Sequence, residues 1–108
     1  MNDTLQALYQ VVLDRKTNPQ EGSYTCYLFD QGIDKICKKV GEESAETIIA
    51  AKNGVQADTV GEISDLIYHL MVLMAQQEIP LDAVLSELDR RSAKIVNLKQ
   101  MKQTDRDT

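Results

Sequence analysis

Apolar residues recur every three or four positions through most of the chain, which is the spacing that places side chains on one face of an α-helix. The first such segment begins at Asp3 or Thr4, either of which can cap a helix, and ends before Asn18 and Pro19. Its apolar positions are Leu5, Leu8, Tyr9 and Val12. The pattern predicts a helix over roughly the first seventeen residues.

Two longer periodic segments follow in the middle of the chain. One runs from near Gly32 to Asn53, where Asn53 and Gly54 form a helix stop signal, and its apolar stripe comprises Ile33, Ile36, Cys37, Val40 and Ile48. The next begins at Asp58 or Thr59. Its broad apolar face contains Val60, Ile63, Leu66, Ile67, Leu70, Met71, Leu73 and Met74. We expect this helix to be the most buried one.

Pro80 suits the first turn of a last helix, whose apolar positions are Leu81, Val84, Leu85, Leu88, Ile95 and Leu98. Between the first two helices, Pro19, Gly22 and Ser23 predict a loop of roughly a dozen residues, with a weak strand-like stretch from Tyr24 to Phe29. The sequence therefore predicts an all-α fold of four antiparallel helices with short connections.

The length of 108 residues allows one domain, assigned to residues 1–98, followed by a polar and flexible tail at 99–108. A core of this size gains from association with a second copy. The net charge of −5 argues against a nucleic-acid binder or an anionic-membrane binder, because both need a basic face. No apolar run reaches membrane-spanning length, and the N-terminus lacks a targeting pattern.

The cysteine and histidine content excludes a zinc site of the usual kind. Cys26 and Cys37 do not form a CxxC pair, and one His cannot complete a zinc site with them. We expect both thiols to be buried as small hydrophobic groups, and the chain to be cytoplasmic.

Two acidic motifs stand out on successive helices. Glu42, Glu43 and Glu46 share one side of the second helix, and Glu62 and Asp65 share one side of the third. Like charges at helical spacing repel one another, so this clustering predicts a cation. An all-oxygen cage favours Mg²⁺, with Mn²⁺ as an alternative. A di-iron bundle is disfavoured, because it needs a Glu-x-x-His motif on two helices.

Single residues of this set also have simpler interpretations. Glu43 alone would be a solvated side chain paired with Lys39. His69 is either a hydrogen-bonded residue at the core boundary, a group that orients a carboxylate, or a phosphate ligand. The hydroxyls of the Ser23, Tyr24 and Thr25 run suit either phosphate binding or local turn hydrogen bonds.

The motifs together resemble a known family. The segments Lys39-Val40-Gly41-Glu42-Glu43-Ser44-Ala45-Glu46 and Glu62-x-x-Asp65-Leu66-x-Tyr68-His69-Leu70 resemble the EExxE…ExxD pattern of the MazG-like all-α nucleoside-triphosphate pyrophosphohydrolases. The Ser-Tyr-Thr run at Ser23, the Tyr68-His69 pair and Glu87-Leu88-x-Arg90-Arg91 narrow the resemblance to the phosphoribosyl-ATP pyrophosphatases. It extends from about Leu5 to Arg91, with Ser64 where the family usually has Ala.

The resemblance implies Mg²⁺-dependent hydrolysis of 1-(5-phosphoribosyl)-ATP to 1-(5-phosphoribosyl)-AMP and pyrophosphate, and a homodimer or higher oligomer. It implies metal binding by Glu43, Glu46, Glu62 and Asp65, with Glu42 and Glu43 catalytic. The substrate-binding residues that it implies are Ser23, Tyr24, Thr25, Lys35, Lys39, His69, Arg90 and Arg91. Two alternatives remain: a house-cleaning pyrophosphatase for dCTP, dUTP or other nucleotides, and a non-catalytic helical dimerisation module.

Overall fold

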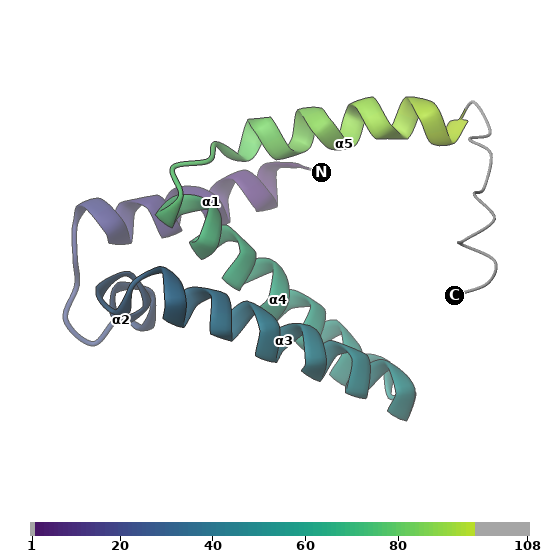
Figure 1. Cartoon of the computed structure of the whole chain (residues 1–108), viewed down its shortest axis with the longest axis horizontal. Coiled ribbons are helices and arrows are strands. Elements are labelled where there is room, and N and C mark those ends of the chain that lie inside the picture. The colour runs from purple at the N-terminus through teal and green to yellow at the C-terminus, as the bar shows by residue number, and fades with distance from the viewer. Residues whose placement is uncertain (1, 97–108) are drawn as a thin grey trace.

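The computed structural model describes the backbone of residues 2–96 and the side chains of residues 3–94. These residues form five helices, α1 (Asn2–Thr17), α2 (Tyr24–Gln31), α3 (Ile33–Asn53), α4 (Gln56–Gln76) and α5 (Leu81–Val96), and no strand (Figure 1). The all-α prediction is confirmed, whereas the prediction of four helices is wrong. Leu98 and the predicted tail at 99–108 lie outside the described residues.

The additional helix is α2, in the segment that the sequence predicts as a loop. Ser23 has extended backbone angles (φ −77°, ψ 126°), and its side-chain oxygen accepts a hydrogen bond from the Cys26 amide, so it caps the helix. Leu28 is fully buried. Gly32 ends the helix with a φ of 89°, a conformation that favours glycine. One capped turn and one buried leucine are enough for a helix of only eight residues.

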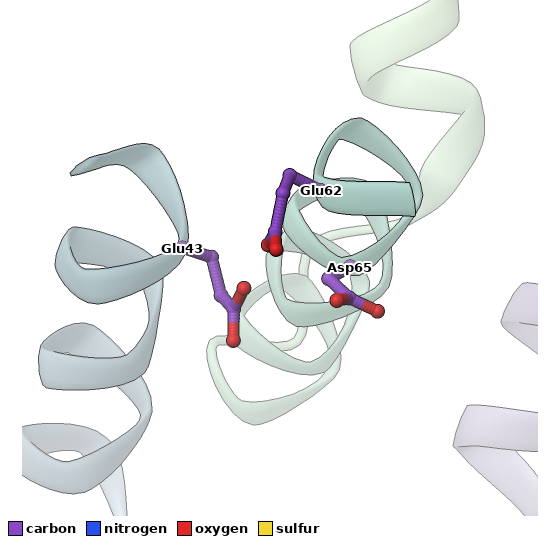
Figure 2. Close-up of side chains that lie close together, drawn as sticks. All are labelled: Glu43, Glu62 and Asp65. Atoms are coloured by element: carbon purple, nitrogen blue, oxygen red, sulfur yellow. The ribbon is translucent and has the colours of Figure 1, made fainter. Parts of the chain in front are cut away.

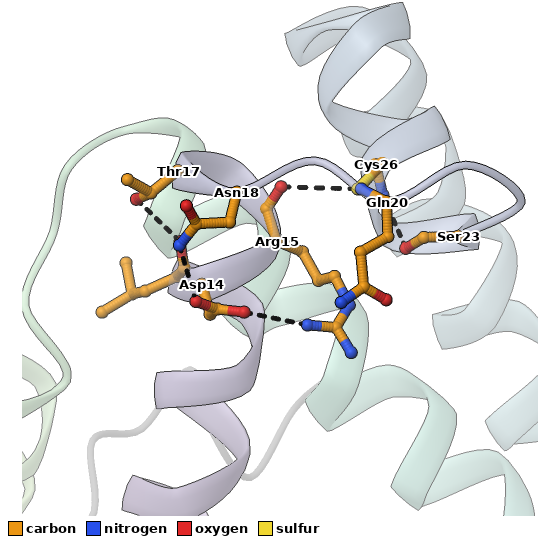
Figure 3. Close-up of polar contacts among 8 residues, drawn as sticks. Asp14, Arg15, Thr17, Asn18, Gln20, Ser23 and Cys26 are labelled. Carbon is orange, nitrogen blue, oxygen red and sulfur yellow. Dashed lines mark hydrogen bonds and ion pairs between the residues drawn. The ribbon is translucent and has the colours of Figure 1, made fainter.

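The connection between α1 and α2 is fixed by short polar contacts around Cys26 (Figure 3). The Cys26 thiol donates to the Arg15 carbonyl oxygen at 3.4 Å and accepts from the Gln20 amide at 3.3 Å. Cys26 is half-buried, while Cys37 is exposed, so the expectation of two buried thiols is wrong for Cys37. Both thiols are free.

Helices α3 and α4 lie side by side as an antiparallel hairpin (Figure 1). Gly54 closes α3 in the left-handed conformation (φ 78°), as the stop signal predicts, and α4 begins at Gln56, two residues before Asp58. The core lies at one end of this hairpin, where α1 and α2 pack against it. Its buried members are Tyr9, Val12, Leu28, Ile36, Met71, Val72, Ala75 and Leu81.

Much of the apolar surface of α4 is not covered within one chain. Val60, Ile63, Ile67 and Leu70 are exposed, and their spacing places them in one stripe along the helix. The prediction that this is the most buried helix is confirmed, because α4 has more buried residues than any other described helix, but all of them lie in its C-terminal half. The stripe leaves an apolar face on the outside of the α3–α4 hairpin.

Helix α5 begins in the core and then leaves it. Leu81 is buried and Leu85 packs against the core, but Leu88 is 55% exposed, and α5 extends away from α3 and α4 (Figure 1). Its apolar face therefore lacks a partner helix in the described part of the chain. No helix within residues 2–96 is both long and apolar enough to cross a membrane.

The burial of Leu28 gives a test of α2. Leu28→Ala leaves a cavity between α2 and the core, so we expect a loss of about 2–5 kcal/mol in the free energy of unfolding. Chemical denaturation followed by circular dichroism at one fixed protein concentration measures it. The control is Val11→Ala on α1, where the side chain is exposed and the cost should be within about 0.5 kcal/mol. Equal costs for both variants would contradict the packing of α2.

Candidate functional site

Three carboxylates from α3 and α4 meet between the two helices. Glu43 points from α3 toward Glu62 and Asp65 on α4 (Figure 2). One carboxylate oxygen from each lies within 4.8 Å of the others. Glu43 is buried, Glu62 is half-buried and Asp65 is exposed, so the cluster runs from the helix interface out to the surface. The structure thus brings together acids from both predicted motifs.

Helical spacing explains why Glu43 is inside. Ile36, Glu43 and Ala50 are the buried residues of α3, and their separation of seven positions, about two turns, puts them on one face. The apolar stripe predicted for this helix shares Ile36 with the buried face. Its members Cys37 and Ile48 are exposed, so the stripe as a whole is not the buried face. The interpretation of Glu43 as a solvated side chain is wrong, because it is only 6% exposed.

The buried carboxylates lack the partners that such groups need. Glu43 Oε2 and Glu62 Oε2 are inaccessible to solvent and have no hydrogen-bond partner among the described residues. Burial raises the pKa of both carboxyl groups, and the charges of Glu46 and Asp65 raise it further. Unpartnered buried oxygens in an oxygen-only cluster fit a hard divalent cation such as Mg²⁺ or Mn²⁺.

Glu46 and Glu42 border this cluster in different ways. Glu46 is exposed and lies outside the group of three that meet within 4.8 Å, but it is close enough to raise the pKa of Glu43 and Glu62. Together with Glu62 and Asp65, it lines an open cleft of about 420 Å³. Glu42 is exposed and faces Lys39, with its Oε1 3.4 Å from the Lys39 Nζ.

Lys39 supplies a positive charge at the edge of the acidic cluster. Its Nζ is also 3.9 Å from Glu43 Oε1, which makes it a shared partner of both glutamates. Burial alone would lower the pKa of Lys39, but Tyr24, Glu42 and Glu43 together raise it above its ordinary value. The amine therefore stays protonated at neutral pH, with its other hydrogens available to an anion.

The hydroxyl groups of the Ser-Tyr-Thr run are used inside the chain. Ser23 caps α2, the Tyr24 hydroxyl is 3.0 Å from His69 Nε2, and the Thr25 hydroxyl contacts the Tyr68 hydroxyl. The predicted turn hydrogen bond is therefore present at Ser23. Tyr68 belongs to the Tyr68-His69 pair that supports the resemblance, but it is not among the predicted substrate-binding residues.

His69 is a buried residue at the boundary of the core. It is 5% exposed, and its Nδ1 lies 2.7 Å from the carbonyl oxygen of Asp65. The structure therefore places it one turn after Asp65, on the same helix as two of the acids.

The remaining predicted substrate residues lie farther from the acids. The Lys35 Nζ is 5.9 Å from the centre of the Tyr27 ring. Arg90 and Arg91 pair with Glu87 at 2.6 and 2.8 Å, which lowers the pKa of Glu87 to about 2. Both arginines are exposed on α5, so the described part of one chain does not bring them to the acidic cluster.

Comparison with known proteins identifies the family of this chain. The sequence model of the family described as phosphoribosyl-ATP pyrophosphohydrolase matches residues 5–92. A protein named phosphoribosyl-ATP pyrophosphatase from Clostridium botulinum (strain Kyoto / Type A2) is 52% identical over 103 residues, 95% of this chain and 94% of its own. Proteins of the same name are 54% identical in Clostridium acetobutylicum (92% of this chain, 90% of its own) and 52% identical in Listeria monocytogenes serotype 4b (92% and 95%).

The raised pKa values of Glu43 and Glu62 predict that removing one of these negative charges stabilises the metal-free protein at neutral pH. Because the pKa values of Glu43 and Glu62 are raised on folding, the stability that they contribute is present at pH below the ordinary carboxyl pKa and is lost as pH rises through the folded-state pKa. At neutral pH and in EDTA, we therefore expect Glu43→Gln to raise the melting temperature. In the wild-type chain Mg²⁺ should raise it too, and Glu43→Gln should weaken that response.

Glu42→Gln is the matched control for this measurement. It neutralises the neighbouring glutamate, which is exposed and paired with Lys39, so its melting temperature in EDTA should not rise. A lower melting temperature for Glu43→Gln in EDTA would contradict the repulsion between the buried acids.

Proposed function

Because this chain belongs to the phosphoribosyl-ATP pyrophosphohydrolase family, we propose that it hydrolyses 1-(5-phosphoribosyl)-ATP to 1-(5-phosphoribosyl)-AMP and pyrophosphate, in L-histidine biosynthesis. The reaction cleaves the bond between the α and β phosphates. The observation that carries the proposal is the oxygen-only cluster of Glu43, Glu62 and Asp65, with its two unpartnered buried oxygens. Hydrolysis of a triphosphate needs a site where a large negative charge is neutralised.

We assign the metal ligands to Glu43, Glu46, Glu62 and Asp65, and the metal to Mg²⁺. Three of these assignments are supported by geometry, because one carboxylate oxygen each of Glu43, Glu62 and Asp65 lies within 4.8 Å of the others. Glu46 is supported by its position, because it lines the same cleft as Glu62 and Asp65. When bound, Mg²⁺ would neutralise triphosphate charge and lower the pKa of a coordinated water.

Glu42 is suited to act on the attacking water. It is exposed at the edge of the cluster, so its carboxylate can accept a proton from water or orient it. The Lys39 Nζ lies 3.4 Å from Glu42 Oε1, and this ion pair holds the carboxylate beside the amine. Lys39 can also donate to phosphate oxygens as charge accumulates on the leaving pyrophosphate. Glu43, by contrast, contributes to catalysis through the metal.

The other residues that the sequence predicts to bind substrate keep that role in the proposal. Ser23, Tyr24, Thr25 and His69 border the α2–α4 contact, and Lys35 lies near the start of α3. The guanidinium groups of Arg90 and Arg91 project from α5, so we assign them to phosphate binding in a neighbouring subunit. That assignment links the substrate site to oligomerisation.

We further propose that the chain is a homodimer or a higher oligomer, located in the cytoplasm. The exposed stripe of Val60, Ile63, Ile67 and Leu70 on α4 has the helical spacing that a second copy of α4 would cover. Leu88 on α5 is a second exposed apolar position. A contiguous apolar face of this kind is typical of an interface.

Loss of one acid tests the catalytic proposal. Asp65 is exposed, so Asp65→Asn should preserve the fold, but it removes one of the three carboxylates that meet. We expect pyrophosphate release from 1-(5-phosphoribosyl)-ATP at saturating Mg²⁺ to fall by about 10²-fold or more. Asp3→Asn, an exposed position on α1, should retain full activity. Full activity of Asp65→Asn would refute the metal site.

A nucleotide panel tests the substrate. The wild-type chain should release pyrophosphate from 1-(5-phosphoribosyl)-ATP with a much higher kcat/KM than from dCTP, dUTP or ATP. Equal turnover of dCTP or dUTP would instead identify a house-cleaning pyrophosphatase. A complete lack of turnover on every nucleotide would favour the non-catalytic dimerisation module.

A charge in the α4 stripe tests the oligomer. Ile67→Glu places an unpaired carboxylate in the proposed interface, so the chain should become monomeric in sedimentation equilibrium while it stays helical. The control is Val11→Glu, which changes a similarly exposed apolar residue on α1 and should leave the oligomer intact. A wild-type chain that sediments as a monomer would disprove the proposed interface.

A further inference from the structure

A chain of hydrogen bonds joins the first turn of α2 to the turn of α4 that follows Asp65. The Tyr24 hydroxyl lies 3.0 Å from His69 Nε2, and His69 Nδ1 lies 2.7 Å from the carbonyl oxygen of Asp65. The imidazole is almost completely buried. Both of its nitrogens therefore have a partner, and the ring is fixed in one orientation.

The chemistry of these partners sets the direction of each hydrogen bond. A carbonyl oxygen can only accept, so His69 Nδ1 must carry the proton that is donated to Asp65. In the neutral ring Nε2 is then an acceptor, and the Tyr24 hydroxyl donates to it. The geometry thus selects the Nδ1–H tautomer of His69.

A second pair of residues reinforces the contact between α2 and α4. Thr25, next to Tyr24, makes a hydrogen bond with the hydroxyl of Tyr68, next to His69. The Tyr68 ring packs edge-on against the His69 ring, with centroids 5.0 Å apart, and the Tyr24 ring does so at 5.8 Å. Consecutive residues on both helices are therefore paired, which fixes the first turn of α2 on α4.

We propose that Tyr24 and His69 are positioning residues of the metal site, which hold the first turn of α2 against the Asp65 turn of α4 in the arrangement that the acids require. The inference rests on the metal site proposed above. Besides the substrate contacts proposed above, it assigns these two side chains a role that acts through other residues. Partners that orient metal ligands typically change metal affinity or activity by 10- to 100-fold.

The tautomer is the first test, and it needs neither a variant nor a metal. His69 is the single histidine of the chain, so ¹⁵N-histidine labelling gives one ring to assign by NMR. In the metal-free wild-type protein we expect the proton of the neutral ring to be on Nδ1. A neutral ring with an unprotonated Nδ1 would overturn the hydrogen-bond chain, because the Asp65 carbonyl oxygen can only accept.

The second test compares two tyrosines of α2 in the nucleotide-free protein. Tyr24→Phe removes the donor to His69, so the Mg²⁺ concentration that gives half of the maximal thermal stabilisation should rise about tenfold. Tyr27→Phe is the matched control, because the Tyr27 hydroxyl has no hydrogen bond among the described residues and its ring is retained. It should leave the Mg²⁺ response unchanged.

The outcomes separate a positioning role from substrate contact. If Tyr24→Phe raises only the KM for the nucleotide and leaves the Mg²⁺ response intact, the positioning role is overturned. His69→Gln keeps an acceptor for Tyr24, so it should retain more of the Mg²⁺ response than His69→Leu, and equal losses would contradict the inference. A wild-type chain whose melting temperature does not respond to Mg²⁺ would overturn the metal site itself. The tautomer measurement needs no metal, so it tests the hydrogen-bond chain separately.

Discussion

The Glu43 carboxylate, which is buried between two helices with one oxygen that has no hydrogen-bond partner among the described residues, is the constraint on which the rest of this structure depends. Glu43 occupies the position on α3 where an apolar residue would otherwise continue the face formed by Ile36 and Ala50. A buried charge of this kind is costly unless it is paired or protonated, and Glu62 and Asp65 make the cost larger. The three acids therefore lower the free energy of unfolding of the α3–α4 hairpin, and a bound divalent cation would raise it again.

The surrounding elements can be understood from this point outward. Lys39 compensates part of the charge on the α3 side, and the Tyr24–His69 contact fixes α2 behind the α4 side. The core that α1 and α2 complete lies at one end of the hairpin, so the acids stay near solvent and open to a cleft. The packed core and the acidic cluster thus occupy different parts of the same two helices, so the acids can serve a function without disrupting the core.

The sequence predicted the elements whose signals are local. The ends of α1 and α3, the start of α5 and the pairing of the two acidic motifs follow from capping residues, glycine and helical spacing. It failed where packing decided the outcome. Leu28 becomes helical because it fills the core, and Glu43 is inside because the true buried face of α3 runs through Ile36 and Ala50. Periodicity shows that Ile63 and Ile67 share a face, but it does not tell whether the same chain covers that face.

The most direct test of the acidic cluster is a crystal structure of the wild-type protein soaked in Mn²⁺ and measured at a wavelength where Mn²⁺ scatters anomalously. We expect one or more anomalous peaks between Glu43, Glu62 and Asp65, about 2.1 Å from their carboxylate oxygens. Glu46 should lie in or beside the same coordination sphere. An anomalous map without a peak at this position, with Glu43 and Glu62 held together by hydrogen bonds between protonated carboxyl groups, would contradict the metal site.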